Sequence, residues 1–310
     1  MAEKNQIVPT DTAYSSALAL QIIKKLKAEY PWIRIKEIGK SVLGRPIEAL
    51  VIGEGRTKVC YNAAFHANEW ITTPVLLKFA EEYAAAVDQG REIYGVDADW
   101  VYRTFQLTLI PLVNPDGVDL VNGMLEGQAL FQAEEIAKQY PNISFPSGWK
   151  ANIEGIDLNL QFPAGWEIAV KNKAALGFTS PAPRDFPGYE PLSAPESIAM
   201  YNFTREQEFS LILAYHTQGE VIYWRYLNNN PPGARRIGEY FKEVSGYTLE
   251  ATPMASGFAG YKDWFIKEYN RPGYTIEAGL GTNPLPIEQF DGIYAANIGI
   301  LVGGMVQLLV

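Results

Sequence analysis

The sequence predicts an α/β fold in a single domain, because short apolar strands alternate with amphipathic helices along the chain. With 310 residues, of which 47% are hydrophobic, the chain can bury a large core as one large domain or as two small ones. No Pro/Gly/Ser linker, charge block, low-complexity run or internal repeat interrupts it, so a single domain over residues 1–310 is the preferred prediction.

The first third of the chain predicts two helices with a group of strands between them. Apolar residues at helical spacing over residues 12–30 predict an amphipathic helix that ends before Pro31. A second helix with an apolar face is predicted from Trp70 to about Val87. The strands predicted between them are residues 33–38, 47–52 and 58–65. Gly and Pro between the first two strands indicate a hairpin.

The middle of the chain has one clear strand and long irregular stretches. The strand is predicted over residues 105–113, and Asn114-Pro115-Asp116-Gly117 is predicted to follow it as a turn that reverses the chain. Residues 120–152 are weakly patterned and are predicted to be mostly loop, which makes them candidates for substrate contacts. The proline-rich residues 172–195 are predicted to form a surface loop before a helix over residues 196–206.

The last third predicts two buried strands and a C-terminal helix. The strands cover residues 209–215 and 273–277, with a short helix over residues 263–269 between them. Residues 292–310 carry no charge, but they are barely long enough to span a membrane and have no basic flank. We therefore expect a helix packed on the sheet, whose glycines allow close approach.

Composition excludes some classes of partner. A net charge of −9 argues against nucleic acid and against an anionic membrane, because neither attracts a negatively charged protein. The single cysteine, Cys60, excludes an intrachain disulfide and is expected to be a small buried residue. Residues 1–6 lack a basic region followed by an apolar core, which predicts a cytoplasmic protein, although a precursor trimmed at cloning would look the same.

The chain has two histidines, and each lies where a predicted strand ends. His66 and Glu69 are three residues apart, so a helical turn would bring an imidazole nitrogen and a carboxylate oxygen to one cation. The alternative is a solvated helix face, where such pairs occur by chance. Their place at the carboxyl end of a strand favours a ligand site. The sequence therefore predicts half of a metal site here.

His216 and Glu277 end the other two predicted buried strands. An ordinary core histidine is the alternative for His216, although such a residue seldom sits where an apolar strand gives way to a loop. A carboxylate in the position of Glu277 is either a partner in a buried pair or a catalytic base, and a metal site nearby favours the base.

Five short motifs follow one another along the chain: His66-x-x-Glu69, Asn114-Pro115-Asp116-Gly117, Gly155-Ile156-Asp157-Leu158-Asn159, His216 and Tyr274-Thr275-Ile276-Glu277. In this order they resemble the zinc carboxypeptidase (M14) family over nearly the whole chain. The resemblance implies a zinc-carboxypeptidase-like domain, with a mixed eight-stranded sheet between helices. It also implies one Zn²⁺ per chain held by His66, Glu69 and His216, and Glu277 as general base. Three protein ligands leave a fourth position for water, as catalytic zinc requires.

The departures from the family pattern concern substrate contacts. Family exopeptidases hold a terminal carboxylate with an Asn-Arg pair, whereas here Asn159 is followed by Leu160. The bidentate clamp on that carboxylate is therefore missing. The arginine that stabilises the oxyanion aligns with Lys150, which can donate as a point charge, and Asn68 replaces another family arginine. The mobile tyrosine of the family has no clear counterpart, although Tyr261 lies near its place.

Within the family, the chain looks most like the bacterial γ-D-glutamyl-meso-diaminopimelate peptidases, on the evidence of four segments: Trp149-Lys150-Ala151-Asn152, Asp157-Leu158-Asn159, Phe162-Pro163-Ala164-Gly165-Trp166 and Glu277-Ala278-Gly279. This resemblance implies zinc-dependent hydrolysis of murein peptides, with Glu277 and Lys150 in catalysis and Asn159 and Lys262 as substrate contacts. Lys262 would pair with a substrate carboxylate. The alternative is a solvated surface lysine.

Two other functions compete with this interpretation. The first is a metallocarboxypeptidase that removes C-terminal residues from ordinary peptides, against which Leu160 counts. The second is a wall-peptide binding protein without activity, which would have no need of a base at Glu277. The expected partners are a murein peptide, no nucleic acid and no membrane, and the sequence does not predict an oligomeric state.

Overall fold

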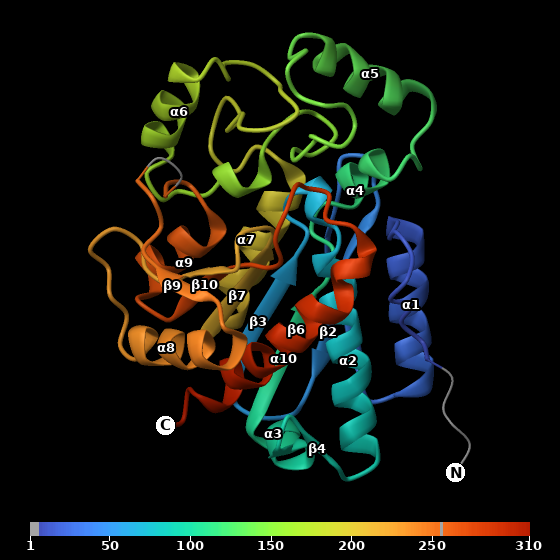
Figure 1. Ribbon diagram of the computed structural model, residues 1–310, viewed down its shortest axis with the longest axis vertical. Helices are drawn as coiled ribbons and strands as arrows, with labels where there is room; N and C mark the ends of the chain where they lie inside the picture. Colours follow the sequence, from blue (N-terminus) through green and yellow to red (C-terminus); the bar gives the residue numbers. More distant parts are fainter. Residues whose placement is uncertain (1–5, 255–256) are drawn as a thin grey trace.

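A computed structural model describes residues 6–254 and 257–310, and its centre is an eight-stranded mixed sheet (Figure 1). The strands lie in the order β1-β2-β6-β3-β7-β10-β8-β9. Their bounds are β1 Arg34–Lys40, β2 Pro46–Ile52, β3 Thr57–Ala63, β6 Phe105–Ile110, β7 Leu211–His216, β8 Val221–Tyr223, β9 Thr248–Glu250 and β10 Gly273–Glu277. Two short strands, β4 (Glu92–Ile93) and β5 (Val96–Asp97), pair separately. The mixed eight-stranded sheet is therefore confirmed.

The four central strands, β6, β3, β7 and β10, run parallel to one another. Their residues are almost all buried, because helices cover both faces of the sheet, and this explains their continuous apolar sequences. The carboxyl ends of parallel strands meet at one edge. In the register of β7 and β10, His216 lies opposite Glu277, so the sheet itself brings these two residues together.

Two helical layers cover the sheet, with a third group of helices at its ends. The helix bounds are α1 Ser16–Glu29, α2 Thr72–Asp88, α3 Ala98–Thr104, α4 Pro115–Val121, α5 Gly127–Lys138, α6 Trp166–Ala175, α7 Pro195–Gln207, α8 Ala234–Ser245, α9 Tyr261–Tyr269 and α10 Phe290–Val306. Alternate residues of β7 face the two layers. Leu213 packs in one core cluster with α1, α2, α8 and α10, and Ile212 packs in the other with α7 and α9.

Helix α10 packs closely on the sheet, as predicted. The Tyr61 hydroxyl on β3 donates to the carbonyl of Leu301 at 2.9 Å. A Cβ built on Gly304 would lie 2.5 Å from that hydroxyl oxygen, so only glycine lets the helix come so near. Over the described residues, every helix is too short or too polar to cross a bilayer. Cys60 is buried in the core, which confirms that prediction.

One predicted turn is wrong. Asn114-Pro115-Asp116-Gly117 begins helix α4 instead of reversing the chain, with the Asn114 side-chain oxygen accepting a hydrogen bond from the Gly117 amide at 3.0 Å. The physical reason is that Asn is a strong N-cap and proline fits the first helical turn, where no partner for its missing N–H is needed.

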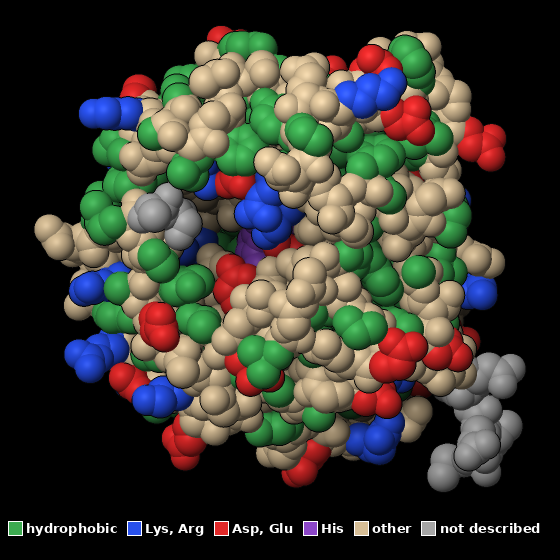
Figure 2. Space-filling view, turned by 45° about the horizontal axis from the view of Figure 1, so that its top comes forward, with side chains coloured by type: hydrophobic (Ala, Val, Ile, Leu, Met, Phe, Trp, Pro, Cys, Tyr) green, Lys and Arg blue, Asp and Glu red, His purple; other side chains and the backbone are tan. Residues whose placement is uncertain are grey.

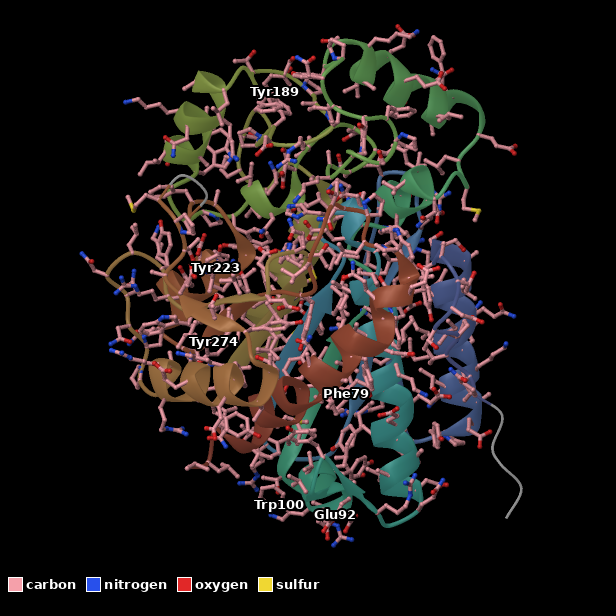
Figure 3. The ribbon with its side chains drawn as sticks, viewed as in Figure 1. Phe79, Glu92, Trp100, Tyr189, Tyr223 and Tyr274 are labelled. Carbon is pink, nitrogen blue, oxygen red and sulfur yellow. The ribbon has the colours of Figure 1, made fainter. Side chains whose placement is uncertain are left out.

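The prediction that residues 120–152 are mostly loop is also wrong in part. They contain α5 and a small core cluster around Trp149. Only Ala133 of α5 is buried, so the helix leaves little apolar periodicity in the sequence. Helices α6 and α8 and the three-residue strands β8 and β9 were not predicted either. In Figure 1, α5, α6 and the irregular segments between them lie at the end of the molecule toward which β3 points, and Tyr189 lies among them (Figure 3).

Candidate metal centre and active site

The local backbone after β3 positions the first two predicted ligands. Ala64 adopts a left-handed conformation with φ 53°, and His66 then precedes a single 3₁₀ turn, Ala67–Glu69. The Thr72 hydroxyl donates to the Glu69 carbonyl at 2.7 Å and accepts from the Ala64 amide at 3.1 Å, which ties this turn to the start of α2. The predicted helical turn between His66 and Glu69 is therefore present, although it is only one turn long.

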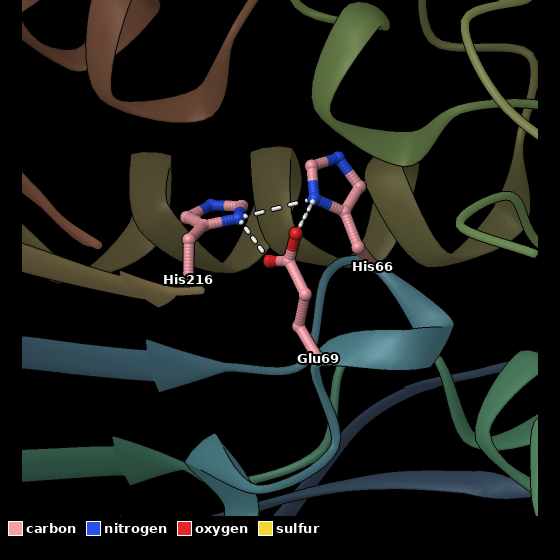
Figure 4. Close-up of side chains that lie close together, drawn as sticks. All are labelled: His66, Glu69 and His216. Atoms are coloured by element: carbon pink, nitrogen blue, oxygen red, sulfur yellow. Dashed lines mark hydrogen bonds and ion pairs between the residues drawn. The ribbon is translucent and has the colours of Figure 1, made fainter. Parts of the chain in front are cut away.

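Three side chains converge at the carboxyl ends of β3 and β7 (Figure 4). The Nδ1 atom of His66 lies 3.0 Å from Oε1 of Glu69, and Nδ1 of His216 lies 2.9 Å from Oε2 of the same carboxylate. The two Nδ1 atoms are 3.2 Å apart. Ligands about 2 Å from a tetrahedral zinc lie roughly 3.3 Å from one another. The residues present therefore fit Zn²⁺, both in donor type and in spacing.

Further partners fix the orientation of these three side chains. The other ring nitrogen of His66, Nε2, lies 3.2 Å from Asp157 Oδ1. The Thr217 amide donates to Glu69 at 3.3 Å, and Asn283 Nδ2 donates to it at 3.5 Å. A histidine that binds metal through one nitrogen commonly donates from the other to a carboxylate. Asp157 has that place here, although the sequence interpretation gave it no role.

Neighbouring charges shift the pKa values of the buried His66 and Glu69 side chains. Burial alone would lower the pKa of His66, but the carboxylates of Glu69 and Asp157 outweigh it and raise that pKa to about 9. Burial would raise the pKa of Glu69, yet His66, Lys150 and His216 hold it well below its usual range. The raised pKa favours a proton on His66 at neutral pH, so metal binding must release that proton.

Glu277 lies where the sequence predicted, at the end of β10 beside His216. Burial raises the pKa of its carboxyl, with Glu69 adding to the rise and His216 opposing it. The side chain lines two neighbouring hollows of the surface. Its role as general base stays a prediction.

Lys150 reaches the site through Glu69. Its Nζ donates to Glu69 Oε1 at 2.7 Å, and although burial opposes it, this carboxylate raises the pKa of the lysine. Lys150 also lines both hollows, so a second donor direction toward a substrate fits the geometry. Its predicted role as an oxyanion donor stays untested.

Lys262 is buried, so the alternative of a solvated surface lysine is wrong. Its side chain is only 4% exposed and donates to the Arg225 carbonyl at 3.0 Å and to Thr252 Oγ1 at 2.7 Å. It also pairs with Asp263 at 2.5 Å. Lys262 is buried because it lies in the first turn of α9, where its side chain lines a hollow beside β10. Contact between Lys262 and a substrate carboxylate stays a prediction.

Asn159 faces the same hollow, and its side-chain oxygen accepts from the Tyr261 amide at 3.0 Å. Leu160, which follows it, is buried and also lines the hollow, so an apolar group stands where the family has its arginine. Tyr261 is fully buried, with its hydroxyl 2.9 Å from Thr204 Oγ1. It is therefore part of the core and does not replace the family's mobile tyrosine.

Two hollows meet over the predicted ligands, and they share Lys150, Arg184, Tyr223 and Glu277. The smaller has a volume of about 200 Å³ and extends toward Asn159 and Lys262. The larger has a volume of about 620 Å³ and extends toward Asn68 and Asn283. Figure 2 shows basic, acidic and histidine side chains gathered at this depression. A hollow of about 900 Å³ between α1 and α2 contains none of the predicted site residues, so its size carries no functional argument.

The structure adds three charged residues to those that the sequence indicated: Lys173, Arg184 and Asp185. Lys173 and Arg184 both form ion pairs with Asp185, and the Asp185 amide donates to Asp157 at 3.1 Å. They lie at the end of α6 or in the irregular segment after it, within the region predicted to be a surface loop. Only the adjacent opposite charges at positions 184 and 185 could have drawn attention to them.

The sequence matches a known peptidase family. A family model described as zinc carboxypeptidase matches residues 19–295. The chain is 46% identical over 293 residues to gamma-D-glutamyl-L-diamino acid endopeptidase 1 of Lysinibacillus sphaericus. The aligned region covers 94% of this chain and 72% of that protein.

Solved structures of low sequence identity share the fold. Carboxypeptidase A from Helicoverpa armigera superposes with a TM-score of 0.73 at 19% identity, covering 99% of this chain and 77% of that one. Murein-tripeptide amidase MpaA from Escherichia coli O157 superposes with a TM-score of 0.56 at 17% identity, covering 87% of this chain and 91% of that one. Because the match of the family model extends over most of the sequence, the chain belongs to the zinc carboxypeptidase family and is a zinc metallopeptidase.

Proposed function

We propose that this enzyme hydrolyses the γ-D-glutamyl-meso-diaminopimelate bond of murein peptides. The observation that carries the proposal is the pair of hollows that meet at Glu277, because a bond within a peptide needs room for chain on both sides. The buried apolar side chain of Leu160 supports it, since a carboxypeptidase needs a cation there for the substrate's terminal carboxylate. The similarity to a gamma-D-glutamyl-L-diamino acid endopeptidase supports the same substrate class.

The smaller hollow suits the leaving diaminopimelate. The far end of this amino acid carries both an ammonium group and a carboxylate. At one wall of the hollow, Lys262 and Asp263 form a buried pair of opposite charges, which could exchange partners with such a zwitterion. Asn159 lies on the same wall, with its side-chain oxygen already engaged by Tyr261 and its amide nitrogen available to a substrate carbonyl.

The residues around the metal position can perform hydrolysis. Bound Zn²⁺ supplies a Lewis acid that polarises a carbonyl and lowers the pKa of water to about 7. Glu277 accepts the proton of the attacking water and passes it to the leaving amine. Lys150, which is held against Glu69 and lines both hollows, would stabilise the carbonyl oxygen as it becomes negative. Asp157 keeps the His66 ring in position.

The test uses the purified enzyme with added zinc on the tetrapeptide L-Ala-γ-D-Glu-meso-diaminopimelate-D-Ala. Mass spectrometry should detect the dipeptide diaminopimelate-D-Ala and the complementary L-Ala-D-Glu. Release of D-Ala alone would indicate a carboxypeptidase instead. An intact tetrapeptide, with blocked ordinary dipeptides hydrolysed at a useful rate, would overturn the proposal in favour of the metallocarboxypeptidase alternative.

The cellular setting of this activity is part of the proposal. A location in the cytoplasm would suit the trimming of muropeptides during recycling or sporulation. Fractionation of cells that produce the protein, followed by immunoblotting, would test this location independently of the activity.

A further inference from the structure

Four basic side chains line the smaller hollow, and three of them are engaged inside the protein. Lys150 donates to Glu69, and Lys173 forms an ion pair with Asp185. Lys262 donates to the Arg225 carbonyl and to Thr252. None of these three cations has its full charge free for a substrate.

Arg184 is the fourth, and it differs from the others. Only its Nε is engaged, in a bond to Asp185 at 2.5 Å. Across residues 6–254 and 257–310, its two terminal nitrogens have no hydrogen-bond partner, and its side chain is 42% exposed. A guanidinium held by Nε presents its remaining donors as a flat fork, which matches a carboxylate.

The backbone around Arg184 is fixed to the site. The Pro183 carbonyl accepts from the amides of Lys150 and Ala151 at 2.7 and 2.9 Å, and the Phe186 carbonyl accepts from the Asp157 amide at 2.8 Å. Arg184 is therefore tied on both sides to the segment that carries Lys150 and Asp157. Such positioning before binding reduces the entropy lost when a ligand is held.

Arg184 also borders the larger hollow, on the other side of Glu277. The described residues that line this hollow are mainly amides and hydroxyls, and Lys150 and Arg184 are the basic residues among them. A negative group of a substrate in this hollow would therefore find unengaged donors at the two terminal nitrogens of Arg184.

We infer that Arg184 binds the α-carboxylate of the D-glutamyl residue on the acyl side of the scissile bond. This inference rests on the proposed function. A γ-glutamyl bond leaves the α-carboxylate free, three carbon atoms from the carbonyl that is attacked. Arg184 and Glu277 both line the boundary between the two hollows, so a carboxylate at that short separation from the reacting carbonyl lies within its reach. Arg184 thereby selects a free glutamate over an amidated one.

The experiment compares three substrates with wild type, Arg184→Gln and a control, Arg103→Gln. The substrates are L-Ala-γ-D-Glu-meso-diaminopimelate, the same peptide with the α-carboxylate amidated, and the same peptide with L-Lys replacing diaminopimelate. Arg103 is an exposed arginine on α3, far from the site. We expect wild type to show a roughly 10- to 100-fold lower kcat/KM on the amidated peptide, because a hydrogen-bonded charge pair is lost.

Arg184→Gln should lower kcat/KM on the first peptide by the same factor and leave the amidated peptide unchanged. Arg184→Lys keeps the charge but lacks the planar fork of donors. Its kcat/KM on the first peptide should lie between the values for wild type and Arg184→Gln. Equal losses on both glutamyl forms, or a wild type indifferent to amidation, would overturn the inference while leaving the proposed function standing. If Arg184→Gln lowers kcat/KM on both diaminopimelate peptides but not on the L-Lys peptide, the partner of Arg184 is the diaminopimelate carboxylate and the inference is wrong. A wild type that cleaves none of the three would overturn the proposed function and this inference with it.

Discussion

Asp157 shows how a residue that does not itself touch the metal position controls the chemistry there. Its Oδ1 faces His66 Nε2 at 3.2 Å, so when Nδ1 binds a metal the remaining ring proton is held on Nε2. The Nδ1 atom is the one that faces Glu69 and His216. Asp157 is fixed in turn by the amides of Asn159 and Asp185, at 3.1 Å each. Backbone hydrogen bonds therefore hold Asp157 in the position that favours the His66 tautomer needed for a metal ligand.

Replacing one carboxylate oxygen of Glu277 by an amide nitrogen tests its role in catalysis separately from substrate binding. Glu277→Gln keeps the size of the side chain but cannot accept a proton at neutral pH. We expect kcat to fall by roughly 10²- to 10⁴-fold, the usual contribution of a general base. Zinc content, measured by elemental analysis, should stay at one per chain, and a non-cleaved substrate analogue should still bind in calorimetry.

Glu239→Gln is the matched control, because Glu239 is half exposed on α8, where it pairs with Arg235. It should leave kcat unchanged. Full activity in the Glu277→Gln enzyme would show that another group accepts the proton. An inactive wild type would instead revive the idea of a binding protein.

Helix α7 buries a carboxyl at its start, and this has a consequence for stability. Glu196 is fully buried and accepts from the Val42 amide and from Asn152 Nδ2, both at 3.1 Å. Burial raises its pKa from 4.5 to about 7, although these hydrogen bonds and its own backbone amide oppose the rise. Between these two pH values the folded chain holds more protons than the unfolded one, so the free energy of unfolding falls as pH rises.

We expect Glu196 to contribute a fall of roughly 3 kcal/mol in the free energy of unfolding between pH 4.5 and pH 7. Urea denaturation of wild type and Glu196→Gln across this range measures it, because the variant cannot titrate and should lose that part of the slope. Glu206→Gln, at the exposed end of the same helix, should keep the wild-type slope. Parallel slopes for wild type and Glu196→Gln would contradict the prediction.

Helix α10 offers a contrast between two glycines of one helix. Gly304 faces the Tyr61 hydroxyl, which is fully buried and bonded to Leu301, so an added methyl group has no space. Gly292, near the start of the helix, has nothing within 4 Å of the place that a Cβ would take. We expect Gly304→Ala to lower the free energy of unfolding by about 1–3 kcal/mol through overpacking. Gly292→Ala should raise it by up to about 1 kcal/mol through helix propensity.

Chemical denaturation of the two variants beside wild type measures both changes. The opposite signs are the test, because helix propensity alone would stabilise both. A stabilised Gly304→Ala would mean that α10 can move away from β3, contrary to the packing described above.

The buried central strands and the places of three site residues could be anticipated from sequence, because both depend on continuous apolar strands. His66, His216 and Glu277 each follow or end such a strand, and parallel strands bring their carboxyl ends together whatever the loops do. Arg184 and Asp185 could not be anticipated, because they lie in an irregular segment held by single backbone hydrogen bonds. Bonds of that kind leave no periodic pattern. The same holds for α5, which buries one residue, and for Asn114, whose capping role needs only one side chain.

At the scale of the whole molecule, the metal position lies at the edge of a core that does not depend on it. Every residue of β7 is buried, and the two core clusters fill opposite faces of the sheet along its length. Removing the metal should therefore abolish activity without unfolding the chain. After metal removal, the raised pKa of His66 would keep this ring positively charged beside the Glu69 carboxylate, so the ligand carboxylate would not be left as an unpaired buried charge.

Zinc should nevertheless stabilise the fold, because it binds the assembled ligands more tightly than the unfolded chain. Free zinc at about 100 times its Kd adds about 2.7 kcal/mol to the free energy of unfolding. For a chain of this size, that corresponds to a rise in Tm of roughly 5 °C. Calorimetry of the chelated and the zinc-loaded protein measures the shift, and both samples should unfold in one cooperative transition. His216→Gln should lose most of the shift while keeping that transition, because one of the three ligands is gone. A chelated protein with no cooperative transition would show that the ligand end of the sheet needs the ion to fold, and that the two core clusters are not sufficient by themselves.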